Sequence, residues 1–160
     1  MPPERVQDVE YMKSVIQRVD RAKVSVEDKV ISRIGKGVLV FLGIEKGDIH
    51  DDADYLLEKI INLRIFEDTE GKMNISLFDI MGDMLIVSQF TLLADCRKGR
   101  RPSFICAEEP EKAKILYEYF IDKAKEKIKH VGNGEFQAMM KIESINDGPV
   151  TMLLDSRRVF

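Results

Sequence analysis

The chain has little of the side-chain chemistry on which many enzymes depend. Its 160 residues include no tryptophan, two cysteines and two histidines. Two cysteines are too few for a disulfide framework, and no His, Asp or Cys stands near them at the spacing of a zinc site. No glycine-rich phosphate loop follows a predicted strand, and no HExxH or CxxC motif occurs. We therefore predict no metal and no cofactor.

A triad of serine, histidine and aspartate is also disfavoured. A hydroxyl nucleophile normally needs an adjacent base. The histidines are His50 and His130, and both fall at ends of predicted helices, where solvated residues are the simplest interpretation. A distant carboxylate such as that of Asp147 is still open as a base.

Long apolar runs and an excess of positive charge are absent as well. No run approaches the roughly 18 apolar residues that span a bilayer, and the start of the chain, with Pro2, Pro3, Glu4 and Arg5, lacks the apolar core of a signal peptide. A net charge of −3 gives no strongly basic footprint. We expect a cytoplasmic protein with neither membrane nor DNA as a partner, while a local basic patch could still meet RNA phosphates.

Short β-branched runs separated by turn-sized gaps predict an antiparallel meander in the first part of the chain. These runs cover residues 15–19, 24–26, 30–34 and 38–44. The run 38–42 is apolar without alternation, which is typical of a central strand buried on both faces. Later runs predict further strands at 84–87, 140–145 and 150–154.

Two segments carry apolar residues at helical spacing. The first helix is predicted over about 51–64, with aspartates in its first turn as the macrodipole favours. The second is predicted from Pro110 to about 130–132, because proline suits a first helical position. One α+β domain results, with about two helices packed on an antiparallel sheet.

Two polar segments that directly follow predicted strands are the most informative part of the sequence. One is Ser88-Gln89-Phe90-Thr91-Leu92, and the other is Asn146-Asp147-Gly148-Pro149-Val150-Thr151. A glycine and a proline set against a strand make a rigid backbone feature that a purely structural strand does not need. This pattern favours chemistry that uses the main chain.

With several other motifs, these segments resemble the D-aminoacyl-tRNA deacylases. The additional motifs are Val15–Val19, Asn62–Phe66, Gly71–Asn74, Arg97–Phe104, and Gly134-Glu135-Phe136 leading to Met140. The resemblance runs from about Met12 to about Asp155. Gln137 departs from it, since the family usually has glycine there. Residues 1–11 precede the usual start, so we divide the chain into an N-terminal extension, 1–11, and a single domain, 12–160.

The resemblance implies a barrel-like β domain that works as a homodimer and hydrolyses D-aminoacyl-tRNA. If selection rests on exclusion of a side chain, mischarged glycyl-tRNA is a further expected substrate, because glycine has no side chain to reject. In the family, the segment Ser88, Gln89, Phe90 and Thr91 lines the pocket for the tRNA 3′ end, with backbone donors near the scissile ester. Gln89 and Phe90 set the shape of the pocket, and Thr91 is a candidate nucleophile. A plain strand end whose polar groups satisfy neighbouring backbone is the alternative.

A second set of residues is implied in chiral selection. In the family, a Gly-cisPro pair, here Gly148 and Pro149 beside Asn146, enters from the partner subunit and turns its carbonyl oxygens to the amino acid. The alternative is a plain turn, because cis X-Pro bonds are uncommon. Arg18 braces this pair in the family, although an arginine on an edge strand is more often a surface charge. Phe136 and Met140 are implied as pocket lining, and simple core residues are the alternative.

A basic run lies a few residues beyond the first segment, where an acceptor stem could pass. We predict phosphate contacts from Lys98, Arg100 and Arg101, with a solvated loop as the alternative.

Two other functions are kept open: a non-catalytic tRNA-end binding module related to a synthetase editing domain, and a generic esterase that uses Thr91 or Cys96.

Overall fold

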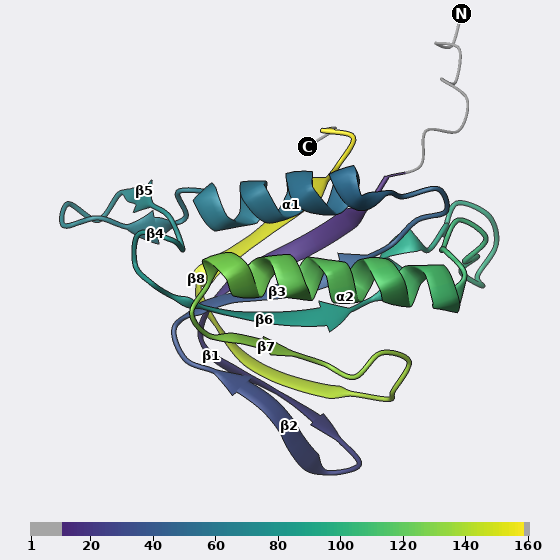
Figure 1. Ribbon diagram of the computed structural model, residues 1–160, viewed down its shortest axis with the longest axis horizontal. Coiled ribbons are helices and arrows are strands. Elements are labelled where there is room, and N and C mark those ends of the chain that lie inside the picture. The colour runs from purple at the N-terminus through teal and green to yellow at the C-terminus, as the bar shows by residue number, and fades with distance from the viewer. Residues whose placement is uncertain (1–10, 159–160) are drawn as a thin grey trace, which may run out of the picture.

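The computed structural model describes residues 11–158 and shows one barrel-like sheet with two helices packed across one of its faces (Figure 1). The strands run in the order β2-β1-β3-β6-β7, and β8 pairs with the other edge of β1. The bounds of these strands are β1 Lys13–Val26, β2 Lys29–Ile34, β3 Gly37–Gly43, β6 Asp83–Ser88, β7 Val131–Asn133 and β8 Lys141–Asp155. A separate two-stranded sheet is formed by β4 Phe66–Glu67 and β5 Met73–Ile75.

Strand β3 is the centre of the sheet, as its unbroken apolar run predicted. It lies between β1 and β6 and buries residues of both faces. Val38, Val40 and Leu42 join the core cluster beneath the helices. Leu39 joins a second cluster with Leu85 and Val87 on the opposite face. Both faces of β3 are therefore covered, which explains why the alternation of apolar and polar residues is missing.

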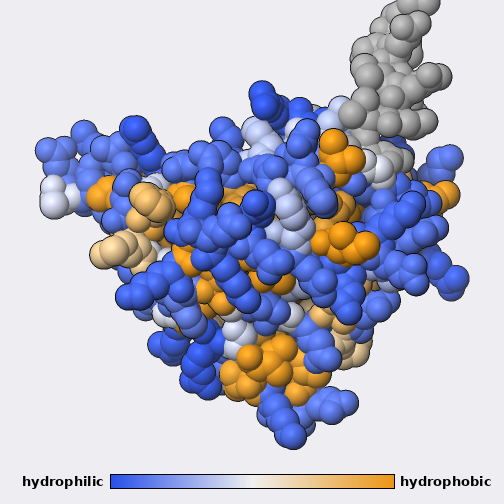
Figure 2. Space-filling view, viewed as in Figure 1, coloured by the Kyte–Doolittle hydropathy of each residue, from blue (hydrophilic) through white to orange (hydrophobic). Residues whose placement is uncertain are grey.

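The two predicted helices are confirmed, with small changes in their ends. Helix α1 spans His50–Asn62, and the Asp52 carboxylate accepts a 2.8 Å hydrogen bond from the Ile49 amide at its start. Helix α2 spans Pro110–Lys127. It ends a few residues earlier than predicted because residues 131–133 leave the helix and pair with β6. The helix-covered side of the molecule is mostly hydrophilic on its outer surface (Figure 2), as amphipathic helices require.

The predicted meander is wrong in its details. Residues 13–26 form a single strand, β1, rather than two, and β3 pairs with β1 instead of with its sequence neighbour β2. One edge of β1 is shared, because its first half pairs with β3 and its second half with β2. The pairs β3–β6 and β6–β7 are parallel, which a meander does not contain. The α+β class with two helices on a barrel-like, largely antiparallel sheet is confirmed.

Residues 1–10 of the predicted N-terminal extension lie outside the described residues. Tyr11, its last residue, donates its amide hydrogen to the Glu45 carboxylate at 2.7 Å. The boundary at residue 12 stays a prediction. Between residues 11 and 158, neither helix is long and apolar enough to cross a membrane.

Gly37 provides a test of the parallel pairing between β3 and β6. A Cβ atom at this position would lie 1.9 Å from the carbonyl oxygen of Asp83, whereas at Gly35 the nearest atom would be 3.5 Å away. We expect Gly37→Ala to lower the free energy of unfolding by about 2 kcal/mol or more, because backbone rather than a movable side chain must shift. Gly35→Ala is the matched control and should change it by less than about 0.5 kcal/mol. Urea unfolding measures both, and equal effects would contradict the close strand approach.

Candidate active site

The segment Ser88–Thr91 turns sharply where β6 ends. Ser88 is the last residue of the strand, and Phe90–Leu93 form the short 3₁₀ helix η1. The backbone amide of Gln89 continues the hydrogen-bond ladder between β6 and β3 by donating to the Leu42 carbonyl at 2.8 Å. Phe90 and Thr91 are exposed, so the turn presents main chain and two side chains at the end of the sheet.

The hydroxyl of Thr91 accepts a hydrogen bond from the Gln89 side-chain amide. Among residues 11–158, no carboxylate or imidazole is hydrogen-bonded to this hydroxyl. His50 stacks on Tyr119 with ring centroids 4.2 Å apart, and Nε2 of His130 lies 3.0 Å from the Arg33 carbonyl oxygen. An amide donor cannot take a proton from a hydroxyl, so this geometry disfavours Thr91 as an activated nucleophile.

Phe136 and Met140 lie beside the same end of β6. The Tyr117 hydroxyl on α2 donates toward the carbonyls of Ile86, at 3.0 Å, and Gly134, at 3.3 Å. The Phe136 ring packs against the Tyr117 ring, with centroids 5.7 Å apart. A Cβ on Gly134 would lie 2.6 Å from the Met140 sulfur. Phe136 and Met140 are both half-buried, and they pack against different core clusters, Phe136 against the one beneath the helices and Met140 against the one on the opposite face.

Tyr117 is a supporting residue that the sequence identified only as part of a helix stripe. Burial raises the pKa of its hydroxyl far above the usual value. The group therefore stays a neutral hydrogen-bond donor that ties the chain at Gly134 to β6. Nothing in the helical spacing distinguishes this tyrosine from its apolar neighbours.

Gln137, which stands where the family usually has glycine, adopts a backbone conformation that favours glycine. Gln137 has a φ of 65°, in the left-handed region, and the Ala138 amide donates back to the Glu135 carbonyl at 3.2 Å. A non-glycine residue pays roughly 1–2 kcal/mol for this conformation. The substitution of the family glycine thus leaves the turn in place and adds an exposed side chain to it.

The second segment is a bulge in β8 and not a turn between two strands. Thr151 pairs with Gln17 and Asn146 pairs with Val19, so the residues 147–150 stand opposite Arg18 alone. The Asn146 side chain closes the bulge by accepting from the Val150 amide at 2.9 Å and donating to the Thr151 hydroxyl at 3.0 Å. The Gly148–Pro149 peptide bond is cis, and Gly148 has a φ of 128°. Both residues are exposed.

Arg18 holds the bulge from beneath. It is 5% exposed, and its Nε donates to the Asp147 carbonyl at 3.1 Å while Nη1 donates to the Ile65 carbonyl at 2.8 Å. Its charge is balanced by the Asp147 carboxylate at 3.4 Å and the Glu67 carboxylate at 3.8 Å. A Cβ on Gly148 would lie 3.0 Å from Nη2 of Arg18. Arg18 is therefore buried and is not a surface charge, while its part in chiral selection stays a prediction.

The two segments are well separated within one chain. Ser88 lies in register with Leu42 and Ser14, whereas the bulge faces Arg18, four residues further along β1. That offset is about 13 Å along the strand, and the three strand-to-strand steps from β6 to β8 add about 14 Å across the sheet. The described chain therefore gathers the predicted site residues into two clusters. Ser88–Thr91, Phe136 and Met140 form one, and Arg18, Asn146, Gly148 and Pro149 form the other.

The basic loop, residues 96–102, is closed at its base by backbone hydrogen bonds between the residues on either side of it. Asp95 and Ser103 pair through hydrogen bonds of 2.7 and 2.9 Å. The Arg97 side chain donates to both carboxylate oxygens of Asp95, from Nε at 2.9 Å and from Nη2 at 2.8 Å. These hydrogen bonds hold the pKa of the Asp95 carboxyl well below its usual range. Lys98, Arg100 and Arg101 are exposed, so their phosphate contacts stay a prediction.

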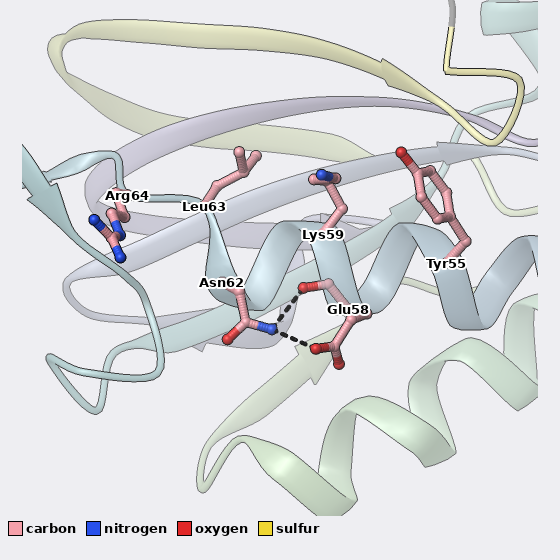
Figure 3. Close-up of a pocket in the computed structure, with 6 residues that line it drawn as sticks. All are labelled: Tyr55, Glu58, Lys59, Asn62, Leu63 and Arg64. Carbon is pink, nitrogen blue, oxygen red and sulfur yellow. Dashed lines mark hydrogen bonds between the residues drawn. The ribbon is translucent and has the colours of Figure 1, made fainter.

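Two surface hollows lie outside these clusters, and the second of them adjoins the bulge at Ile145. One, of about 460 Å³, runs along α1, where the Asn62 amide is bound to Glu58 of its own helix (Figure 3). The other, of about 650 Å³, lies between β1, β2 and β8 and is lined in part by Arg21, Lys23 and Arg33. Neither contains a predicted site residue. Between residues 11 and 158, no group of three or more His, Cys, Asp or Glu side chains could hold a metal ion.

The chain belongs to the D-Tyr-tRNA(Tyr) deacylase family, whose model matches residues 15–155. A D-aminoacyl-tRNA deacylase of Syntrophus aciditrophicus is 68% identical over 149 residues, which cover 93% of this chain and 100% of the relative. The resemblance expected from the motifs is thus confirmed.

Two solved structures share the fold. A protein described as c-Myc DNA Unwinding Element Binding Protein is 40% identical, with a TM-score of 0.84 over 89% of this chain and 97% of its own. A probable eukaryotic D-amino acid tRNA deacylase is 19% identical, with a TM-score of 0.79 over 91% of this chain and 99% of its own. The absence of a DNA partner for this chain stays a prediction.

The buried fork of Arg18 should be sensitive to a change that keeps its charge. Lysine has one ammonium group and cannot donate in the same fixed geometry to the carbonyls of both Ile65 and Asp147. We expect Arg18→Lys to lower the free energy of unfolding by about 1–3 kcal/mol, the cost of a buried acceptor left unpaired. Arg21→Lys, on the exposed part of the same strand, is the control and should be nearly neutral. Denaturant unfolding compares the two, and an equally neutral Arg18→Lys would mean that charge alone holds the bulge.

Proposed function

We propose that this protein hydrolyses the ester that joins a D-amino acid to the terminal adenosine of tRNA, and so frees both for reuse. The observation that carries the proposal is the match of the family model to residues 15–155, a range that includes both site segments. The activity is a chirality check on translation, and its substrate places it in the cytoplasm. Glycyl-tRNA is a second expected substrate.

The chemistry needs little from side chains. An aminoacyl ester is already activated, so positioning and stabilisation of the developing negative charge can supply much of the acceleration. The turn at Ser88–Thr91 offers main-chain donors, with Gln89 and Phe90 shaping the pocket around the reacting ester. The 2′-hydroxyl of the substrate's own ribose activates water or takes part directly. This role fits a cluster in which Thr91 is bonded to an amide and not to a base.

Selection against L-amino acids rests on exclusion. Two carbonyl oxygens of the Gly148–Pro149 segment hold the ammonium group of the substrate and leave no room for a side chain of L configuration. Fixed acceptors can do this only if the backbone does not move, and Arg18 supplies that rigidity through its bond to the Asp147 carbonyl. Phe136 and Met140 line the other side of the pocket.

The complete pocket belongs to a homodimer, in which Gly148 and Pro149 of one subunit enter the cluster at Ser88 of the other. The separation of the two clusters along the sheet supports this arrangement, since one chain does not bring them together. Gly148 and Pro149 are exposed, and exposed apolar side chains flank the bulge at Ile145, 42% exposed, and Leu153, 54% exposed. Such a surface suits contact with a second copy.

The test of the activity is the loss of ester from D-tyrosyl-tRNA, L-tyrosyl-tRNA and glycyl-tRNA. The proposal expects rapid loss of the D ester, measurable loss of the glycyl ester and persistence of the L ester. A binding module without catalysis would leave all three esters intact. A generic esterase would cleave the D and L esters alike.

Mixed dimers test whether the subunits share sites. Gln89→Ala damages the first cluster, and Gly148→Ala damages the second, because a Cβ there meets Val150 at 2.8 Å and Arg18 at 3.0 Å. Each variant alone should lose most of its activity. Refolding them together should restore up to about a quarter of the wild-type rate, since hybrids hold one intact pocket out of two and are half of the dimers. Hybrids that form and stay inactive would contradict the shared pocket.

The role of Thr91 is tested by comparing two deletions of a hydroxyl. Thr91→Ala should keep at least about one tenth of the wild-type kcat, because an unactivated hydroxyl is not the nucleophile. A substrate with a 2′-deoxy terminal adenosine should lose about 100-fold or more, in the range of a general acid–base contribution. Single-turnover rates with both substrates measure this. The reverse pattern would make Thr91 the nucleophile.

A further inference from the structure

An exposed pair of aromatic rings joins Phe90 of the first cluster to Phe104, a residue to which the mechanism assigns no role. Phe90 is 60% exposed and Phe104 is 36% exposed. Their ring centroids are 5.0 Å apart at an interplanar angle of 65°. An edge-to-face pair of this kind leaves a ring face open to solvent.

The two phenylalanines come from different parts of the chain. Phe90 begins η1 between Gln89 and Thr91, so it borders the reacting ester of the proposed function. Phe104 follows Ser103, which closes the foot of the basic loop by pairing with Asp95. The ring pair therefore joins the catalytic turn to the loop that carries Arg100 and Arg101.

Open aromatic faces beside cations match unpaired nucleic acid better than they match protein. Bases of a single strand stack on aromatic side chains while arginine and lysine follow the phosphates. Lys98, Arg100 and Arg101 are exposed, whereas Arg97 is held by Asp95. The three exposed cations lie within six residues of Phe104 in the sequence. A tRNA 3′ end leaving the pocket along this loop passes the rings before its phosphates reach the arginines.

We propose that Phe90 and Phe104 form a stacking platform for an unpaired nucleobase of the tRNA 3′ end, namely the base next to the terminal adenosine. The inference rests on the proposed function, because it places the terminal adenosine at Gln89 and Thr91. It assigns a substrate-binding role to Phe104, and it explains why a phenylalanine stays exposed at the foot of a cationic loop.

Phe104 is the residue to change, since Phe90 belongs to the catalytic turn. Phe104→Ala removes the open face, Phe104→Trp restores one, and Ile105→Ala deletes a neighbouring exposed apolar side chain, 70% exposed, as the control. Each full-length variant is assayed with D-tyrosyl-tRNA and with the D-tyrosyl ester of adenosine, which has no neighbouring base. Melting temperatures establish that the variants fold.

Phe104→Ala should raise the KM for D-tyrosyl-tRNA about 5- to 150-fold, which corresponds to the loss of one stacked base, with kcat within about twofold. The KM for the adenosine ester should not change, Phe104→Trp should return the tRNA KM to near the wild-type value, and Ile105→Ala should match the wild type. Equal losses on both substrates would show that Phe104 only supports Phe90. No loss on tRNA, or an equal loss from Ile105→Ala, would also overturn the platform.

A binding measurement separates failure of the platform from failure of the proposed function. An oligonucleotide of the tRNA 3′ end carries 2-aminopurine next to the terminal adenosine, and its fluorescence is quenched when the base stacks. Quenching by the wild type that Phe104→Ala abolishes and Phe104→Trp restores supports the platform even if no D ester is cleaved. Binding without quenching, or no binding, overturns it even if hydrolysis is confirmed.

Discussion

The site depends on one buried contact, the hydrogen bond from Arg18 to the carbonyl of Asp147. Four residues of β8 stand opposite one residue of β1 at this point. These four residues form no ladder pairs with β1, so other contacts must fix their position. The guanidinium fills the gap and is itself held by the Ile65 carbonyl. A buried cation is stable only when its donors are used and its charge is balanced, and Asp147 and Glu67 supply the balance. The position of Gly148 and Pro149 is thereby tied to the core.

Under the proposed function, this constraint accounts for the scarcity of reactive groups. A pocket that acts through fixed carbonyls and amide hydrogens needs a rigid backbone more than it needs a tuned pKa. The described structure places its strongest supports under main chain: Arg18 beneath the bulge, Asn146 across it, and the Tyr117 hydroxyl between Ile86 and Gly134.

The sequence predicted the helices, the central strand and both site segments, because these depend on local periodicity and on motifs. It did not predict that residues 13–26 form one strand or that residues 141–155 form another. Polar residues interrupt both runs. The bracing position of Arg18 was expected from the resemblance alone, because its partners lie 47 and 129 residues away and no local pattern indicates them. Pairing of β3 with β6 in parallel depends on the same long-range order. The supporting role of Tyr117 could not be predicted from the sequence, because its position in the helix is the same as that of any core residue.

The same geometry links selectivity to assembly. A rigid bulge can screen a ligand only if the ligand is brought to it, and the turn after β6 lies about 13 Å along the strands and three strands across from it. Moving the two together within one chain would break the register of β1 with β3 and β8, which carries the core. A second copy can approach without any such change, and it can keep both clusters rigid. The proposed sharing of the pocket between subunits is therefore the arrangement that disturbs this fold least.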